Sequence, residues 1–168
     1  MPVKLIRIDD RYIHGQVTVG WVNAYNISEI WVVDDALATN ELLKKIQVAM
    51  APPGKKVEVL TLNEAVERLK NKYYSKSSNI MIIFATPEAC RRVLEKAPIE
   101  DINWINVGQS GWKKGKTLVT KNFAVDEKDV EEFVKLASMG YKLIYQMLPD
   151  HKPEDFYSIL KKKGLIKS

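Results

Sequence analysis

Short unbroken runs of apolar residues alternate along this chain with stretches in which apolar residues recur every three or four positions. An unbroken apolar run suits a strand that is covered on both faces, as strands are in a parallel sheet. The alternation therefore predicts one doubly wound α/β domain over residues 1–168, with a mostly parallel sheet and helices on both faces. The predicted strands span 3–8, 29–35, 57–60, 80–84, 102–107 and 141–147, with short extended pieces at 118–119 and 123–125. The pattern leaves the strand order open, although it favours a central place for 80–84 and an edge for 141–147.

Capping residues indicate where the predicted helices begin. A side-chain oxygen just before a helix accepts an N–H of the first turn, and proline fits the first helical position. One helix carries a clear apolar stripe of Leu42, Leu43, Ile46, Ala49 and Met50 before Pro52-Pro53-Gly54 stops it. The predicted starts are Asp34-Asp35, Thr61 in a capping box with Glu64, Thr86 before Pro87, Asp126, and Pro153 for the last helix.

Composition restricts the class of protein. The 168 residues are 46% hydrophobic and 28% charged, which is ordinary for a soluble globular domain. The longest apolar run, 80–85, is far shorter than the roughly 20 residues of a membrane span, and acids come too early for a signal peptide. The single cysteine, Cys90, excludes an internal disulfide and lies at helical spacing with core residues. These features predict a cytoplasmic protein. Its net charge of +5 favours acidic partners or an anionic membrane surface over nucleic acid.

Polar residues gather where the first predicted strand gives way to a helix, in the order Asp9, Asp10, Arg11, His14, Gly15. In an open parallel sheet this turn lies at the carboxyl edge, where such folds bind ligands. His14 falls near a helix N-terminus, whose free N–H groups favour anions and phosphate in particular. The chemical hypothesis is a phosphate-handling histidine. The alternative is a turn whose polar residues serve only in local capping.

The string Arg7-Ile8-Asp9-Asp10-Arg11-Tyr12-Ile13-His14-Gly15-Gln16-Val17 resembles the signature of the IIB component of the mannose/fructose/sorbose family of the bacterial sugar phosphotransferase system. The resemblance continues through Asn106-Val107-Gly108, Gly115-Lys116-Thr117 and Val125-Asp126-Glu127-Lys128-Asp129-Val130, and so covers essentially the whole chain. The chain departs from the family pattern at Gly108-Gln109-Ser110, where another glycine and a methionine usually follow the first glycine, and at Ala85, where a basic residue is common.

The resemblance implies a phosphoryl carrier of this fold. His14 would accept a phosphoryl group from a IIA phosphohistidine and pass it to a sugar carried by the membrane components IIC and IID. Arg11 would contact the phosphoryl group. The protein would need no cofactor, and it would meet the membrane only through its partners. Neither the identity of the sugar nor the oligomeric state follows from the sequence.

The residues around His14 suit such chemistry. A neutral imidazole is a nucleophile near pH 7, and an arginine offers two donors to phosphate oxygens in a fixed fork. Gly15 allows close approach of the backbone, so the amides of Gly15 and Gln16 are expected to bind phosphate. Asp10 would either orient the imidazole or pair with Arg11, and the second role is preferred here.

Other polar residues carry weaker predictions. The segment 108–115 is predicted to be a mobile loop, and Lys113, Lys114 and Lys116 form either a docking patch for partners or a merely solvated surface. His151 lies in the turn-rich segment 149–153 and is expected to be solvated. No spacing of metal ligands occurs, so a metal site is not predicted.

Two alternative functions stand beside the carrier. A histidine phosphatase also follows its first strand with a histidine and a glycine, but it has arginine directly before the histidine, where this chain has Ile13. It also needs a second catalytic histidine, for which the chain offers only His151. A basic α/β module that binds RNA or a nucleotide is the second alternative, although no glycine-rich phosphate loop of known spacing is present.

Overall fold

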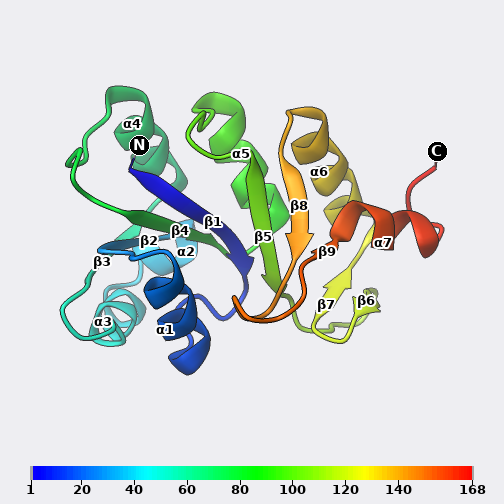
Figure 1. The fold of residues 1–168 in the computed structure, drawn as a ribbon, viewed down its shortest axis with the longest axis horizontal. Helices are drawn as coiled ribbons and strands as arrows, with labels where there is room; N and C mark the ends of the chain where they lie inside the picture. The colour runs from blue at the N-terminus through cyan, green and yellow to red at the C-terminus, as the bar shows by residue number, and fades with distance from the viewer. Residues whose placement is uncertain (1, 168) are drawn as a thin grey trace.

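The chain is folded around a seven-stranded sheet with the strand order β3-β2-β4-β1-β5-β8-β9 (Figure 1). The architecture is that of a computed structural model, which describes residues 2–167. All neighbouring strands run parallel except β9, which is antiparallel to β8. The strands of this sheet are β1 (Val3–Asp9), β2 (Glu29–Val33), β3 (Lys56–Leu60), β4 (Ile80–Phe84), β5 (Trp104–Gln109), β8 (Lys142–Tyr145) and β9 (Glu154–Asp155).

The predicted fold class is confirmed, and so are most of the strands. Every residue of β2 and β4 is buried, as expected for strands with helices on both sides. The middle strand is β1, and β4 lies beside it rather than at the centre. The fifth strand begins and ends two residues later than predicted, at Trp104–Gln109, so the start of the expected loop 108–115 belongs to the sheet. As predicted, β8 lies near an edge.

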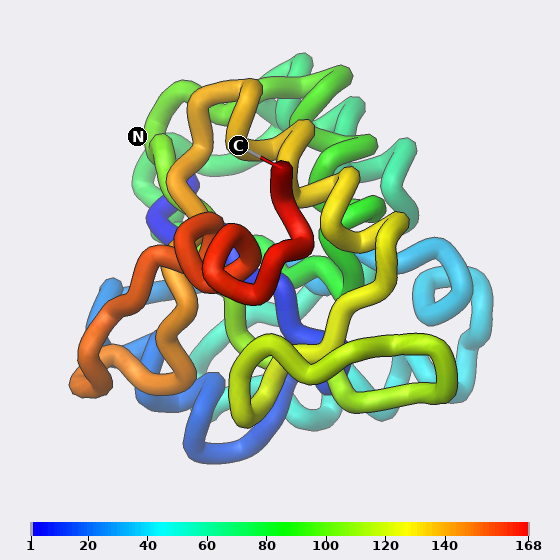
Figure 2. Tube along the Cα trace, turned by 90° about the vertical axis from the view of Figure 1, so that its right-hand side faces the viewer, coloured from blue at the N-terminus to red at the C-terminus, as the bar shows by residue number. Residues whose placement is uncertain are grey.

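The helices form two layers, one on each face of the sheet (Figure 1). One hydrophobic cluster joins the sheet to α1 and α2, and the other joins its opposite face to α4, α5, α6 and α7. Figure 2 views the end of the molecule that carries α7 and the small antiparallel hairpin of β6 (Thr117–Thr120) and β7 (Phe123–Val125). The helices are α1 (Gly15–Ala24), α2 (Asp35–Ala38), α3 (Glu41–Ala49), α4 (Leu62–Asn71), α5 (Pro87–Lys96), α6 (Glu127–Ser138) and α7 (Phe156–Lys162).

Three of the predicted helix starts are confirmed, and Asp34 starts the separate short helix α2, whereas Asn40 caps the helix with the apolar stripe. Asp34, Thr61, Thr86 and Asp126 each accept an N–H of the following first turn, and Thr61 and Asp126 do so within capping boxes. The last helix is present with Phe156 and Leu160 buried as predicted, but it begins at Phe156 rather than at Pro153. Residues 154–155 first pair with β8, and Asp155 caps α7. The free cysteine, Cys90, is fully buried in the core, where desolvation raises the pKa of its thiol.

The apolar stripe of α3 is present but does not face the core. The buried side chain of α3 is Gln47, whereas Leu42, Leu43, Ile46 and Met50 are exposed. A sequence stripe shows that one side of a helix is apolar, but it does not show what covers that side.

Candidate functional site

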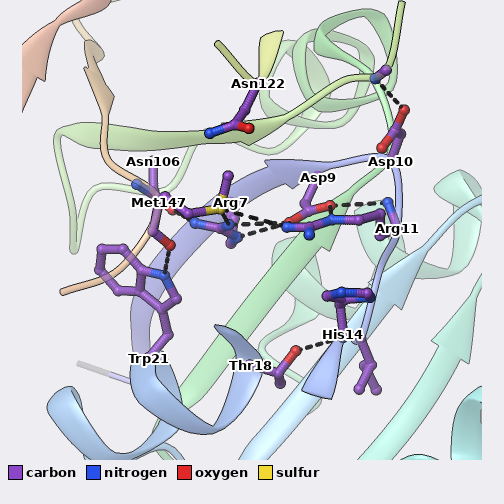
Figure 3. Close-up of polar contacts among 12 residues, drawn as sticks. Arg7, Asp9, Asp10, Arg11, His14, Thr18, Trp21, Asn106, Asn122 and Met147 are labelled. Carbon is purple, nitrogen blue, oxygen red and sulfur yellow. Dashed lines mark hydrogen bonds and ion pairs between the residues drawn. The ribbon is translucent and has the colours of Figure 1, made fainter. Parts of the chain in front are cut away.

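Strand β1 places two charged residues, Arg7 and Asp9, in the interior of the protein. The turn after it adds the partly buried Arg11. Arg7 and Asp9 are almost fully buried, and they lie two residues apart on the same strand. Oδ2 of Asp9 accepts Nη2 of Arg7 at 3.0 Å and Nη2 of Arg11 at 3.0 Å. Oδ1 of Asp9 accepts both the backbone N–H and Nε of Arg11, at 2.9 and 3.1 Å. One buried carboxylate therefore fixes two guanidinium groups (Figure 3).

The guanidinium of Arg7 is enclosed by segments far away in the sequence. Its Nη1 donates to Oδ1 of Asn106 on β5, and it also donates to the carbonyl oxygen of Gln146 at 3.3 Å. The ring of Trp21 lies 5.5 Å from Cζ. A Cβ at Gly108 would come within 2.5 Å of Cζ, so glycine is required there. Burial lowers the pKa of Arg7, and the charge of Asp9 opposes that effect.

Sequence reasoning missed Arg7 as a part of the site. A charged residue within the apolar run of a central strand is a signal that could have found it, because a buried charge requires a partner. Its partners Asn106 and Gly108 lie in the second segment that carried the family resemblance, but their contact with Arg7 becomes visible only in the fold.

His14 lies at the junction between the turn and α1. It is the N-cap residue of the helix, but its side chain makes no capping hydrogen bond. Its backbone N–H instead donates to Oγ1 of Thr18 at 2.7 Å, while its carbonyl oxygen accepts the N–H of Val17. The imidazole is exposed, and in Figure 3 it projects from the same turn as the side chain of Arg11.

Three hydrogen-bond donors around His14 are available to a ligand. Within residues 2–167, the N–H groups of Gly15 and Gln16 and the Nη1 group of Arg11 have no hydrogen-bond acceptor. Gly15 adopts a positive φ of 42°, which favours glycine at the first helical position of α1. Free amides at a helix N-terminus, together with a guanidinium held by a buried carboxylate, form an arrangement that attracts an anion.

Asp10 does not take the role preferred from the sequence. The ion-pair partner of Arg11 is Asp9, which lies inside the sheet at the end of β1. Asp10 points the other way along the turn, and its Oδ2 accepts the N–H of Gly111 at 2.8 Å. In the described part of the chain it makes no hydrogen bond to the imidazole of His14 either. Asp10 therefore connects the turn after β1 to the loop after β5.

Tyr12 lies in the same turn and has an unusual backbone conformation. It adopts a left-handed φ of 61°, which is unfavourable for a bulky residue and is kept only where the surroundings impose it. Burial and the adjacent carboxylate of Asp34, the cap of α2, raise the pKa of Tyr12 to about 12. The phenol therefore stays neutral at physiological pH.

A cleft of about 480 Å³ opens beside Arg11. His151 lines this cleft, so the second histidine, although exposed as expected, lies nearer to the site than the sequence indicated. Other polar lining residues are Gln109, Lys121, Asn122, Gln146, Lys152 and Glu154.

The three lysines of the predicted docking patch have different surroundings. Lys116 forms an ion pair of 2.9 Å with Asp129 at the start of α6. Lys113 and Lys114 are exposed. The described residues contain no group of three or more His, Cys, Asp or Glu side chains that could hold a metal ion, and none of their helices is long and apolar enough to cross a membrane.

The fold and the site define an α/β protein that presents a histidine, flanked by anion-binding groups, at the carboxyl edge of its sheet. Residues 3–168 match the family described as PTS system sorbose subfamily IIB component. The chain belongs to this family, whose members are phosphoryl-transferring IIB components of the sugar phosphotransferase system, as the resemblance implied.

Individual relatives agree with this assignment. The chain is 30% identical to the fructose-specific EIIB component of Bacillus subtilis (strain 168), over 96% of this chain and 97% of that one. It is 36% identical to the mannose-specific EIIAB component of Escherichia coli (strain K12) over 85% of this chain, but it spans only 43% of that relative's length. The crystal structure of the IIBSor domain of the sorbose permease from Klebsiella pneumoniae covers 96% of this chain, with a TM-score of 0.90 and 29% identity.

Proposed function

We propose that His14 accepts a phosphoryl group from a phosphohistidine of an EIIA protein and passes it to a sugar that the membrane components IIC and IID import. The single observation that supports this proposal is an exposed imidazole at a helix N-terminus, beside an arginine fixed by a buried carboxylate. The chain would act in the cytoplasm and meet the membrane only through its partners. One continuous sheet supports residues 1–168 as a single domain.

The residues of the turn have separate roles in this transfer. A ring nitrogen of His14 attacks phosphorus and forms a P–N bond, while the P–N bond to the donor's histidine breaks and that imidazole leaves. Nη1 of Arg11 and the amides of Gly15 and Gln16 donate to the phosphoryl oxygens during the exchange. A sugar hydroxyl then attacks phosphorus and forms a P–O bond, the P–N bond to His14 breaks, and the hydroxyl proton passes to the departing imidazole of His14. Between the two transfers, the amides of Gly15 and Gln16 also hold the phosphoryl group on His14.

Incubation with the phosphorylated EIIA protein of the same organism tests the proposal. Intact-mass measurement should find one added phosphoryl group on this chain. The adduct should be lost in acid and survive base, because a phosphoramidate behaves in this way and a phosphoserine ester does not. Steady hydrolysis of p-nitrophenyl phosphate without an adduct would favour the phosphatase instead. Salt-dependent binding of generic RNA would favour the nucleic-acid module.

Substitution of Arg11 should slow transfer without unfolding the protein. Arg11→Lys keeps the charge but loses the fork that Asp9 holds, so impairment is expected already in this variant. Loss of one charged hydrogen bond is worth roughly 1.5–3 kcal/mol, so Arg11→Ala should reduce the transfer rate about ten- to a hundredfold. Rapid-quench measurement of phosphoryl transfer from EIIA gives both rates.

The control for Arg11 is Arg92→Ala, which removes an exposed arginine from α5 on the opposite face of the sheet. Wild-type rates in both Arg11 variants would limit Arg11 to a structural ion pair with Asp9.

We also propose that Lys113 and Lys114 assist docking of acidic partners. Both side chains are exposed in the loop that Asp10 connects to the turn of His14. Charge reversal to glutamate at both positions should slow transfer from EIIA, with a smaller defect at high salt because salt screens exposed charges. Reversal of Lys72 and Lys76, which are exposed in the segment before β4, is the control. Equal rates for the wild type and the Lys113/Lys114 variant at low salt would contradict the role.

A further inference from the structure

Helix α3 exposes its apolar side to solvent. Leu42, Leu43, Ile46, Ala49 and Met50, which we term the α3 stripe, lie on one side of the helix at steps of about 100° per residue. Leu42 is 68% exposed and Ile46 is 46% exposed. A contiguous exposed apolar surface on a folded domain indicates a binding site for another molecule.

Two hydrogen bonds fix the position of α3, one made by Asn40 at its start and one made by Gln47 near its end. Asn40 caps the helix by accepting the N–H of Leu43 at 3.1 Å, so the first turn is formed. Gln47 is buried, and its Oε1 accepts the N–H of Ile13 at 3.4 Å. A rotation that buried the stripe would remove Gln47 from this position and leave the amide of Ile13 without its acceptor. The protein therefore keeps the apolar side outward.

The contact between Gln47 and Ile13 places α3 beside the turn that carries His14. Ile13 directly precedes His14, so α3 is connected to the turn that carries the reactive imidazole. Helices α3 and α1, whose N-terminus is His14, cover the same face of the sheet (Figure 1). A protein that exchanges a phosphoryl group with His14 must cover the surface around it, because the two imidazoles have to approach within bonding reach of one phosphorus.

Charges beside the stripe indicate the chemistry of the partner. Lys45 is exposed on α3, one turn from both Leu42 and Ala49 of the stripe, and Glu41 supplies an acid at the helix start. Lys56, at the start of β3, is already paired with Glu29 at 3.5 Å and with Glu58 at 3.9 Å. The matching surface is apolar, with one acidic group placed to meet Lys45. The mannose-specific relative is an EIIAB component, and this chain spans 43% of its length. In that relative, an EIIA part and an EIIB part therefore occur in one chain.

We propose that the α3 stripe is the docking surface for the phosphorylated EIIA donor, and this inference rests on the proposed function of His14. EIIA approaches from the α1–α3 layer and buries Leu42 and Ile46. An acidic group of EIIA faces Lys45. The stripe contributes to recognition and leaves the chemistry at His14 unchanged.

The test is the double variant Leu42→Gln, Ile46→Gln, assayed for single-turnover transfer from phosphorylated EIIA at increasing donor concentrations. Glutamine is a good helix former, so α3 should persist, and circular dichroism checks it. We expect the donor concentration for half-maximal rate to rise about tenfold or more, with the rate at saturation within about twofold of the wild type. The matched control is Tyr73→Gln, which changes a residue as exposed as Leu42, at 69%, after α4 on the opposite face.

Several outcomes would overturn the docking proposal. One is an unchanged half-maximal concentration in the double variant, and another is an equal rise in Tyr73→Gln. Normal transfer from EIIA with impaired delivery to sugar in membrane vesicles would assign the stripe to the membrane components. A wild-type dimer in sedimentation that the double variant dissociates would assign it to a second copy of this chain. Failure of EIIA to label His14 even in the wild type would instead overturn the proposed function.

Discussion

His14→Gln should abolish phosphorylation by EIIA, and His151→Gln should leave it intact. His14 has the free amides of α1 and the fixed guanidinium of Arg11 beside it. His151 lines the same cleft as Arg11, but it is exposed in the segment between β8 and β9 and lies at no helix N-terminus. Peptide mapping of the phosphorylated chain under basic conditions, which preserve a phosphoramidate, should therefore place the label on the peptide that contains His14.

The stability of the two variants provides the control. Because the imidazole of His14 is exposed and makes no capping bond, His14→Gln should change the free energy of unfolding by no more than about 0.5 kcal/mol. A folded His14→Gln variant that still took up phosphate would remove His14 from its role. A label on His151, or an acid-stable label on serine or threonine, would do the same.

Asp9→Asn should produce the largest loss of stability of any single change at the site. The side chains of Arg7 and Asp9 are only 2% and 1% exposed, so the substitution leaves a buried guanidinium without its counter-charge. Removal of one partner from a buried ion pair typically costs about 3–5 kcal/mol. Transfer should slow as well, because Arg11 loses the carboxylate that orients it. Urea unfolding, followed by circular dichroism, measures the first effect.

An exposed ion pair offers the comparison for Asp9. Glu95 pairs with Arg91 at 2.7 Å but is 60% exposed, and Glu95→Gln should cost less than about 1 kcal/mol. Similar urea midpoints for Asp9→Asn and Glu95→Gln would show that burial of the Arg7–Asp9 pair contributes little to stability.

Local patterns predicted much of this fold. Unbroken apolar runs identified the strands, and side-chain oxygens at Asp34, Thr61, Thr86 and Asp126 marked helix starts, because both signals depend on neighbouring residues. The strand order was not predictable, since it depends on contacts between distant segments. The start of α7 was misplaced for the same reason: residues 154–155 pair with β8 before the helix begins.

The site was predicted in part. The sequence placed His14 and Arg11 correctly on the turn between β1 and α1. It did not reveal that Asp9, rather than Asp10, holds Arg11, because side chains in a strand alternate and the turn then changes direction. Arg7 was missed because its partner Asn106 lies on another strand. The outward side of α3 could not be inferred, since an apolar stripe is the same whether the domain itself or a partner covers it.

The carboxylate of Asp9 also bears on the group-transfer potential of the loaded protein. The guanidinium groups of Arg7 and Arg11 around the one carboxylate of Asp9 leave a single net positive charge. Of the two guanidinium groups, Arg7 is buried and only Arg11 is accessible to a ligand. A phosphoryl group that carries about two negative charges is thus attracted but not fully neutralised. An intermediate that is bound too tightly raises the barrier of the following step. In the proposed carrier, we expect Asp9 to moderate Arg11 and so to keep a phosphoryl group on His14 at an energy from which a sugar hydroxyl can remove it.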